Sequence, residues 1–173
     1  MSQKRIALIS TGGTIEKTYD ELSGVLSNRV SVLDVMMASL QLRGVSVDRV
    51  GLMNKDSLEM SEADHELIAT TAAHFSTTHD GVVVAHGTDR LAKSGERLHQ
   101  RLESPRVPIV FTGAMIPWVM RTTDALQNLT EALIAVQLLP AGVYLAMHNM
   151  VLRFPGVVKD PKLGTFVLRP ERE

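Results

Sequence analysis

A hydroxyl and a carboxylate, those of Thr88 and Asp89, follow a strongly apolar segment of this sequence. The segment, Val82–Val84, is a run of β-branched residues without polar alternation, which is typical of a strand covered on both faces. Gly87 then breaks the run. In an open parallel sheet the ligand crevice lies outside the carboxyl ends of the strands, so these side chains are predicted to face such a crevice. A threonine hydroxyl there can act as a nucleophile once a base or a cation acts on it.

Two other segments repeat this arrangement of an apolar strand followed by glycine and threonine. The run Arg5–Ile9 precedes Thr11–Thr14, and the run Val107–Phe111 precedes Thr112–Met115. Because the carboxyl ends of parallel strands lie at one edge of a sheet, the three segments predict a single shared crevice. Its lining would consist of hydroxyls and backbone N–H groups.

Several basic or phenolic side chains could activate Thr14 or Thr88, and spacing along the chain does not select among them. The candidates near predicted strand ends are Tyr19, Lys55, Lys93 and Lys159. Both motifs also have a purely structural interpretation. Gly12 and Gly13 suit a tight strand exit, and Thr88 and Asp89 suit the N-cap of a following helix.

The composition excludes several other kinds of site. The chain has no cysteine, and its six histidines show no metal-binding spacing, so neither a metal nor another cofactor is predicted. Dinucleotide and P-loop glycine fingerprints are missing, and so is a Gly-x-Ser-x-Gly elbow. A net charge of −1 and 4% aromatic residues argue against nucleic-acid binding, and no apolar run is long enough to span a membrane.

The pattern of apolar runs and caps predicts one α/β domain over residues 1–173. Strands are predicted at about 5–10, 45–53, 82–84, 107–111 and 143–147, and helices at about 31–44, 61–78, 90–103 and 123–138, with Ser31 and Ser61 as N-caps. Residues 11–30 are expected to form a lid or binding loop, and residues 148–173 a hairpin or an irregular tail. The alternation favours a three-layer domain with a mainly parallel, flavodoxin-like sheet.

Together, the three threonine–glycine segments resemble the signatures of the bacterial threonine-dependent L-asparaginase family. Thr11-Gly-Gly-Thr-Ile15 is similar to the first signature, and Gly81-Val-Val-Val-Ala-His-Gly-Thr-Asp89 to the second. Val110-Phe-Thr-Gly-Ala-Met115 also matches, in the same order and spacing. The resemblance covers nearly the whole chain and implies the fold of the N-terminal domain of those enzymes.

The resemblance also implies which residues carry the reaction. Thr14 corresponds to the first catalytic threonine, on a mobile loop, and Tyr19 to a tyrosine that polarises its hydroxyl. Thr88, Asp89 and Lys159 match a second catalytic group. Thr14 is the predicted nucleophile, which attacks the amide to give an acyl-enzyme and ammonia before water completes the hydrolysis. Direct attack by water, positioned by Thr88 and Lys159, is an open alternative.

The same resemblance implies a set of substrate-binding residues. Asn54 and Lys55 lie where a serine and a glutamine usually hold the α-amino acid head. Asp89 also helps to hold the α-amino group, and the backbone of Ala114 contacts the side-chain amide.

Some features depart from the family pattern. Glu16 replaces a small residue, Arg90 replaces a threonine, and Lys55 would repel a substrate ammonium unless it turns away or contacts the carboxylate. Family members usually carry a C-terminal domain that completes the neighbouring subunit's site. This sequence is expected to be the short, single-domain kind, assembled as a homodimer or a homotetramer.

The predicted function is the hydrolysis of L-asparagine to L-aspartate and ammonia in the cytoplasm, with glutamine as a slower substrate. Three alternatives stay open: an amidase for another small amide, a sensor that binds an amino acid without turnover, and an inactive fragment of a longer enzyme. The combination of Thr14, Thr88, Asp89 and Lys159 argues against a sensor, which would not need two hydroxyls and a lysine.

Overall fold

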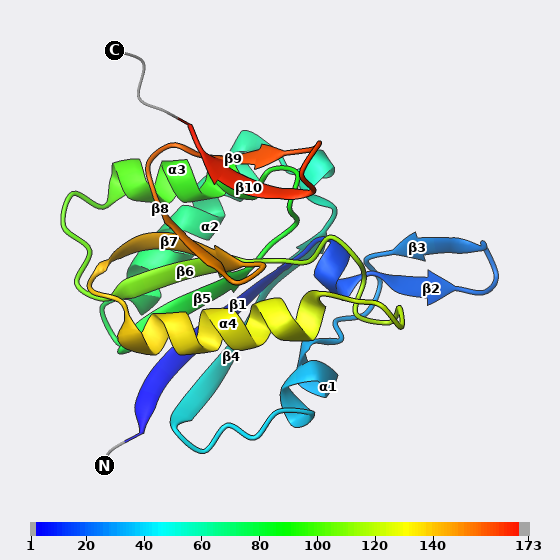
Figure 1. Ribbon diagram of the computed structural model, residues 1–173, viewed down its shortest axis with the longest axis horizontal. Helices are drawn as coiled ribbons and strands as arrows, with labels where there is room; N and C mark the ends of the chain where they lie inside the picture. The colour runs from blue at the N-terminus through cyan, green and yellow to red at the C-terminus, as the bar shows by residue number, and fades with distance from the viewer. Residues whose placement is uncertain (1–2, 170–173) are drawn as a thin grey trace.

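A six-stranded sheet forms the centre of the structure, a computed structural model that describes residues 3–169 (Figure 1). Its parallel strands are β1 (Lys4–Gly12), β4 (Val45–Lys55), β5 (Gly81–Ala85), β6 (Pro108–Thr112) and β7 (Gly142–Met147). At one edge, β8 (Met150–Arg153) runs antiparallel to β7. The spatial order is β4-β1-β5-β6-β7-β8. The parallel strands, counted along the chain, therefore follow the flavodoxin-like order 2-1-3-4-5, and the predicted fold class is confirmed.

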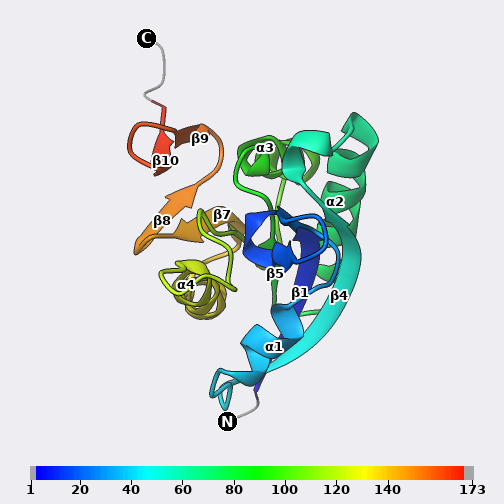
Figure 2. The same cartoon turned by 90° about the vertical axis from the view of Figure 1, so that its right-hand side faces the viewer.

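Helices cover both faces of this sheet, which gives three layers (Figure 2). The helices α2 (Glu62–Phe75) and α3 (Leu91–Arg101) pack on one face, and α1 (Leu33–Ala38) and α4 (Ala125–Leu138) on the other. Val83 belongs to the core under α1 and α4, whereas Val82 and Val84 belong to the core under α2 and α3. Both faces of β5 are thus buried, which explains its unbroken apolar sequence.

The helix starts differ in how well local sequence predicts them. At α2, Ser61 accepts a hydrogen bond from the Asp64 N–H (3.2 Å) and the Asp64 carboxylate accepts one from the Ser61 N–H (2.8 Å), so the predicted cap is present. The prediction of a helix from Ser31 to Gly44 is wrong, because α1 spans only Leu33–Ala38 and no side chain caps it. The Ser31 hydroxyl instead donates to the buried carboxylate of Glu16. Across residues 3–169, every helix is too short or too polar to cross a membrane.

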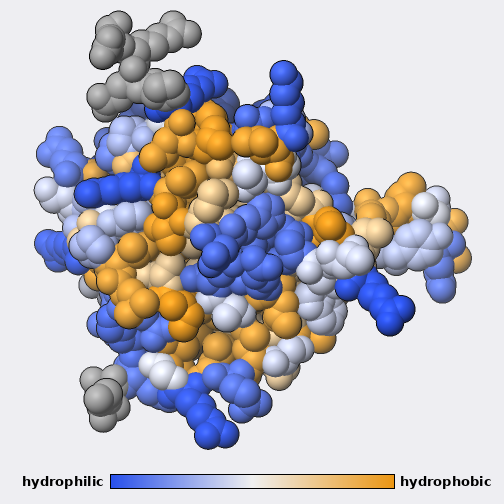
Figure 3. Space-filling model, viewed as in Figure 1, coloured by the Kyte–Doolittle hydropathy of each residue, from blue (hydrophilic) through white to orange (hydrophobic). Residues whose placement is uncertain are grey.

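The long segment after β1 contains a 3-10 turn, Thr14–Glu16, and a hairpin of β2 (Thr18–Asp20) and β3 (Val25–Ser27). This hairpin projects from the body of the molecule (Figure 1). Several of its side chains are apolar and exposed (Figure 3), such as Leu22, which is 92% exposed. The segment is therefore an ordered arm beside the carboxyl edge of the sheet.

The chain beyond β7 forms two hairpins. His148 and Asn149 have φ angles of 55° and 60°, which suit the tight turn between β7 and β8. The strands β9 (Val157–Asp160) and β10 (Thr165–Leu168) form a separate antiparallel pair. Phe154 docks this pair on α3 above Gly95, where a Cβ would lie 2.1 Å from the Phe154 ring. Residues 170–173 of the predicted tail lie outside the described residues.

Candidate active site

Loops that follow β1, β4, β5 and β6 meet at the carboxyl edge of the sheet. The Gly13 N–H donates to the Lys55 carbonyl (2.8 Å), which joins the ends of β1 and β4. The His86 N–H donates to the Thr112 carbonyl (2.9 Å), which joins the ends of β5 and β6. The three predicted threonine–glycine segments therefore lie at one edge of the sheet.

The turns that precede Thr14 and Thr88 touch through their glycines. A Cβ on Gly13 would lie 2.2 Å from the Cα atom of Gly87, closer than any side chain permits. Gly13 also has φ 78° and ψ −173°, a conformation essentially restricted to glycine. Thr14 and Thr88 thus directly follow the two glycines, Gly13 and Gly87, whose backbones touch. This contact requires glycine at position 13, because a Cβ there would collide with Gly87.

Substitution of Gly13 by alanine is expected to lower the free energy of unfolding by about 3 kcal/mol, because strain and a backbone clash add together. Gly24 provides the control, since its φ is also positive (72°) but no atom lies within 4 Å of a Cβ placed there. The corresponding change at Gly24 is expected to cost only about 1 kcal/mol. Urea unfolding of the two variants measures both values, and equal losses would contradict the proposed contact.

The structure brings together Thr88, Asp89 and Lys159. The Lys159 ammonium donates to the Thr88 hydroxyl (2.9 Å) and to the Asp89 carboxylate (2.7 Å). Thr88 is only 3% exposed, whereas Asp89 lies at the surface. Neither side chain caps α3, although the structural interpretation of the motif required it. The N-cap residue is Arg90, and the two side chains are instead turned to the lysine on β9.

Thr14 and Tyr19 are placed less closely together. Thr14 begins the 3-10 turn and is half-buried, while Tyr19 lies on β2 and is 65% exposed. Tyr19 lines an open cavity that also includes Val119 and Met120. Between these two described residues there is no side-chain hydrogen bond, so the phenol and the Thr14 hydroxyl are not joined in this arrangement.

The predicted head-binding residues, Asn54 and Lys55, lie at the end of β4. The Lys55 ammonium turns away to Asp64 (2.8 Å), and its hydrogen bond lowers the pKa of that carboxyl to about 2. Asn54 accepts a hydrogen bond from the Asn28 amide (3.2 Å) in a cleft of about 300 Å³. Within the described part of the chain, Ser27 Oγ and Asn28 Oδ1 have no hydrogen-bond partner, but both atoms are buried beneath the cleft surface. The cleft is lined mainly by polar and charged side chains, which suit a small polar ligand.

Ala114, the predicted amide contact, is fully buried and lies in a loop braced by residues that sequence reasoning missed. Asp124 accepts hydrogen bonds from the next two backbone N–H groups, those of residues 115 and 116 (3.0 and 2.9 Å). His148 Nε2 lies 2.7 Å from the same carboxylate, and the Asn128 amide donates to the Gly113 carbonyl (2.9 Å). Burial alone would raise the pKa of Asp124, but these hydrogen bonds lower it. A signal in the sequence was the polar pair Asp124 and Asn128, one helical turn apart.

A buried hydrogen-bonded network of side chains supports the turn that precedes Thr88. Ser94 Oγ lies 2.7 Å from His65 Nδ1 and 2.8 Å from His86 Nε2, and His86 Nδ1 lies 2.8 Å from the Gly87 carbonyl. A carbonyl only accepts, so His86 donates through Nδ1 and accepts from the Ser94 hydroxyl at Nε2. This fixes the tautomer of His86 and holds the residue before Thr88. The sequence identified these histidines only as residues without metal-binding spacing.

The pKa of His86 predicts how stability depends on pH. Burial lowers this pKa from 6.5 to about 4. Between these values the unfolded chain binds more protons than the folded one, so the free energy of unfolding is expected to fall as pH falls from 6.5 towards 4. The loss is on the order of 3 kcal/mol. Urea unfolding at a series of pH values measures it. His86→Asn should flatten this dependence and His74→Gln, at an exposed position, should not; an unchanged slope in His86→Asn would contradict the assignment.

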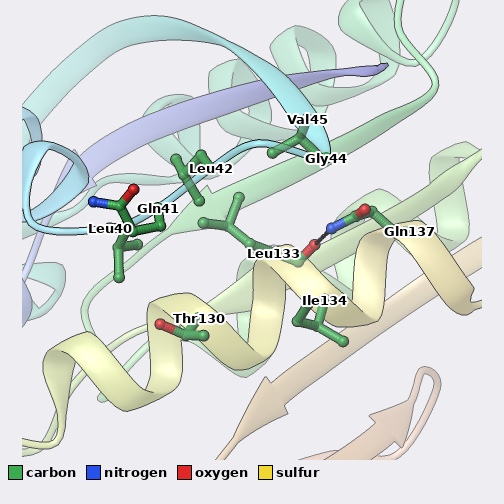
Figure 4. A pocket seen from close by; sticks show the side chains of 9 residues that line it. All are labelled: Leu40, Gln41, Leu42, Gly44, Val45, Thr130, Leu133, Ile134 and Gln137. Atoms are coloured by element: carbon green, nitrogen blue, oxygen red, sulfur yellow. Dashed lines mark hydrogen bonds between the residues drawn. The ribbon is translucent and has the colours of Figure 1, made fainter. Parts of the chain in front are cut away.

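A separate hollow lies at the opposite edge of the sheet, beside the start of β4 (Figure 4). It is enclosed by the chain before β4 and by the side of α4 that faces this segment (Figure 4). None of its lining residues is titratable: Leu40, Gln41, Leu42, Gly44, Val45, Thr130, Leu133, Ile134 and Gln137. This hollow therefore offers no group for the chemistry considered above.

Comparison with known proteins gives one family match and several relatives of this chain. Residues 5–161 match the family described as Asparaginase, N-terminal. The chain is 28% identical to an L-asparaginase of Thermococcus kodakarensis over 162 residues, which are 92% of this chain and 49% of the relative. It is 35% identical to a glutamyl-tRNA(Gln) amidotransferase subunit of Haloquadratum walsbyi over 145 residues, 83% of this chain and 33% of the relative.

Two solved structures superimpose on nearly the whole chain. L-asparaginase I from Vibrio cholerae superimposes with a TM-score of 0.80 at 25% identity, over 96% of this chain and 52% of that one. A probable cytoplasmic L-asparaginase from Campylobacter jejuni gives 0.77 at 29% identity, over 95% and 51%. The chain thus spans about half the length of these L-asparaginases and about a third of the amidotransferase subunit.

Proposed function

Because the chain belongs to the asparaginase family, through the N-terminal family that matches residues 5–161, we propose that it is an amide hydrolase that releases ammonia from L-asparagine. The observation that carries the proposal is the group of Thr88, Asp89 and Lys159 at the backbone junction that also leads to Thr14. Two hydroxyls, a carboxylate and an ammonium at one edge of the sheet suit acyl transfer to a threonine.

In the proposed reaction, Thr14 Oγ forms a bond to the amide carbon and the C–N bond then breaks. The nitrogen takes up the proton that the Thr14 hydroxyl loses and leaves as ammonia, which gives an ester on Thr14. Water cleaves the ester, restores the hydroxyl and releases the acid. Thr88, held by Lys159, is proposed to assist proton movement, and backbone N–H groups near Thr14 and Thr88 would stabilise the developing oxyanion.

The polar cleft lined by Asn28 and Asn54 is proposed to hold the head of the substrate. Asp89 and Asn54 are the proposed contacts for the α-amino acid group, and the backbone of Ala114 for the amide. The contact of Lys55 with Asp64 supports this assignment, because it directs a repelling charge away from a substrate ammonium. Tyr19 would reach Thr14 only when the β2–β3 hairpin moves inward.

The proposal includes assembly as a homodimer or a homotetramer in the cytoplasm. The support for this location is the C. jejuni protein, whose name includes the word cytoplasmic. Light scattering of the purified chain measures its subunit number. A discrete oligomer is expected, and a monomer at the concentration of the activity assay would contradict the assembly.

Ammonia release tests the function directly. The purified chain is incubated with L-asparagine, L-glutamine, a simple aliphatic amide, or no substrate. We expect release from asparagine and slower release from glutamine. Release of ammonia from the simple amide alone would indicate an amidase for another small amide. Binding of asparagine in a calorimeter without release of ammonia would indicate a sensor.

A second candidate function comes from the relatives named as amidotransferase subunits, to which the identity reaches 35%. In this alternative the chain would be one component of an amidotransferase, and its ammonia would be consumed by a partner. The observation that separates the two is turnover by the chain alone. Full activity without a partner supports the free hydrolase, and activity that appears only with a co-purified protein supports the amidotransferase component.

A further inference from the structure

The turn that carries Thr14 also contains a buried carboxyl, that of Glu16. Its side chain is 1% exposed. The proposed reaction gives Glu16 no role. Its contacts indicate what it does.

Glu16 bonds to both sides of the segment that contains Thr14 and the hairpin. Its Oε2 atom accepts a hydrogen bond from the Gly12 N–H (3.1 Å), two residues before Thr14. Its Oε1 atom accepts one from the hydroxyl of Ser31, which follows the hairpin. One side chain therefore closes the base of the arm formed by residues 17–30.

The arm is held by bonds within itself and by bonds at its base. Asp20 accepts hydrogen bonds from the Leu22 N–H (3.1 Å) and the Ser23 hydroxyl (2.6 Å), and it pairs with Arg29 (2.7 Å). At the base, the Asn28 amide donates to the carbonyl of Gly13 (2.8 Å), and the Lys17 ammonium pairs with Asp56 (2.6 Å). The arm is thus fixed at its base, close to Thr14.

Stability does not account for Glu16. Among residues 3–169 no cation pairs with its carboxylate; the nearest guanidinium, that of Arg49, contacts Asp34 (2.8 Å) and Ser31 (3.5 Å) instead. Burial accordingly raises the pKa of Glu16. A buried carboxyl held by two neutral donors contributes little to stability compared with an apolar or small side chain. Its two hydrogen bonds point instead to a role in geometry.

We propose that Glu16 is a positioning residue that holds the backbone around Thr14 against the base of the β2–β3 arm. The bond to Gly12 holds the turn before Thr14, and the bond to Ser31 holds the end of the arm at the same place. Both bonds together fix the position of the turn that carries the nucleophile. The inference rests on the proposed function only for its effect on turnover.

The first test is a double-mutant cycle on turnover. Glu16→Ala and Ser31→Ala are each expected to lower kcat about tenfold, with KM changed less than about twofold, because misplacement of a reacting group affects the chemical step. The double variant should be no slower than Glu16→Ala, since both changes remove the same hydrogen bond, the one between Glu16 and Ser31. Glu16→Gln should recover part of kcat, and Glu21→Gln, at an exposed position of the arm, should behave like the parent. Additive losses would overturn the tie between Glu16 and Ser31.

The second test does not need catalysis. Amide hydrogen exchange is measured on the parent chain and on the Glu16→Ala and Glu21→Gln variants. The Gly12 amide is expected to exchange about tenfold faster only in Glu16→Ala, the factor that corresponds to one net hydrogen bond. If the parent releases no ammonia, the proposed function fails. Faster exchange of the Gly12 amide in Glu16→Ala would still show that Glu16 holds the turn. Unchanged exchange at Gly12 overturns the inference whatever the activity.

Discussion

A Thr14→Ala variant is expected to lose at least about 10³-fold in kcat for ammonia release and to keep its fold. The hydroxyl is the proposed nucleophile, and the remaining groups only bind and polarise the amide. Thr14 is half-buried and its hydroxyl makes no hydrogen bond within residues 3–169, so its removal leaves no buried partner unpaired. The measurement is the rate of ammonia release from asparagine, together with the thermal unfolding midpoint.

Thr18 supplies a matched control for this variant. It lies four residues further along the same segment, on β2, and it is also half-buried. Thr18→Ala should retain most of the activity. If Thr14→Ala keeps normal turnover as well, the nucleophile is misassigned, and attack by water positioned by Thr88 and Lys159 becomes the better mechanism.

Lys159→Met is expected to lower kcat by about 10²- to 10³-fold with little loss of stability. The change removes the ammonium that donates to Thr88 and Asp89, while methionine keeps most of the apolar stem. The ion pair itself contributes at most about 1 kcal/mol, because Asp89 is exposed to solvent. Activity should therefore fall far more than the free energy of unfolding, and steady-state kinetics and urea unfolding measure the two.

Lys162 is the control for this second variant. It lies in the same β9–β10 hairpin and is exposed, and only its backbone N–H takes part in a described hydrogen bond. Lys162→Met should match the parent in both measurements. Equal activity of the Lys159→Met and Lys162→Met variants would show that the tail does not take part in the reaction.

The central strands could be predicted because each carries its own signal, whereas their flavodoxin-like order in space was a preference that no local signal fixes. Val82–Val84 is buried by its neighbours on both faces, and an uninterrupted apolar run records this directly. The start of α2 was equally local, since Ser61 and Asp64 cap each other. The start of α1 was not, because the Ser31 hydroxyl bonds to Glu16, fifteen residues away in sequence. A side chain that fits a local cap can instead bond to a distant partner.

The candidate site follows the same rule. The positions of Thr14 and Thr88 at strand ends could be inferred from the apolar runs that precede them, whereas Lys159 required a family resemblance. His148 braces the loop after Ala114 across 24 residues of sequence, through Asp124. Nothing near His148 in the sequence indicates this contact, since it arises when the β7–β8 turn places the ring beside α4. Residues that bond locally were predictable, and residues that brace from a distance were not.

The docking of Phe154 over Gly95 has a consequence for how the protein matures. Lys159 is 70 residues from Asp89 in sequence, and it arrives on β9, which follows every strand of the central sheet. A chain that emerges from the ribosome can therefore form the central sheet before Lys159 has reached Thr88 and Asp89. The contact of Lys159 with these two residues then forms only after the β9–β10 hairpin has packed on α3.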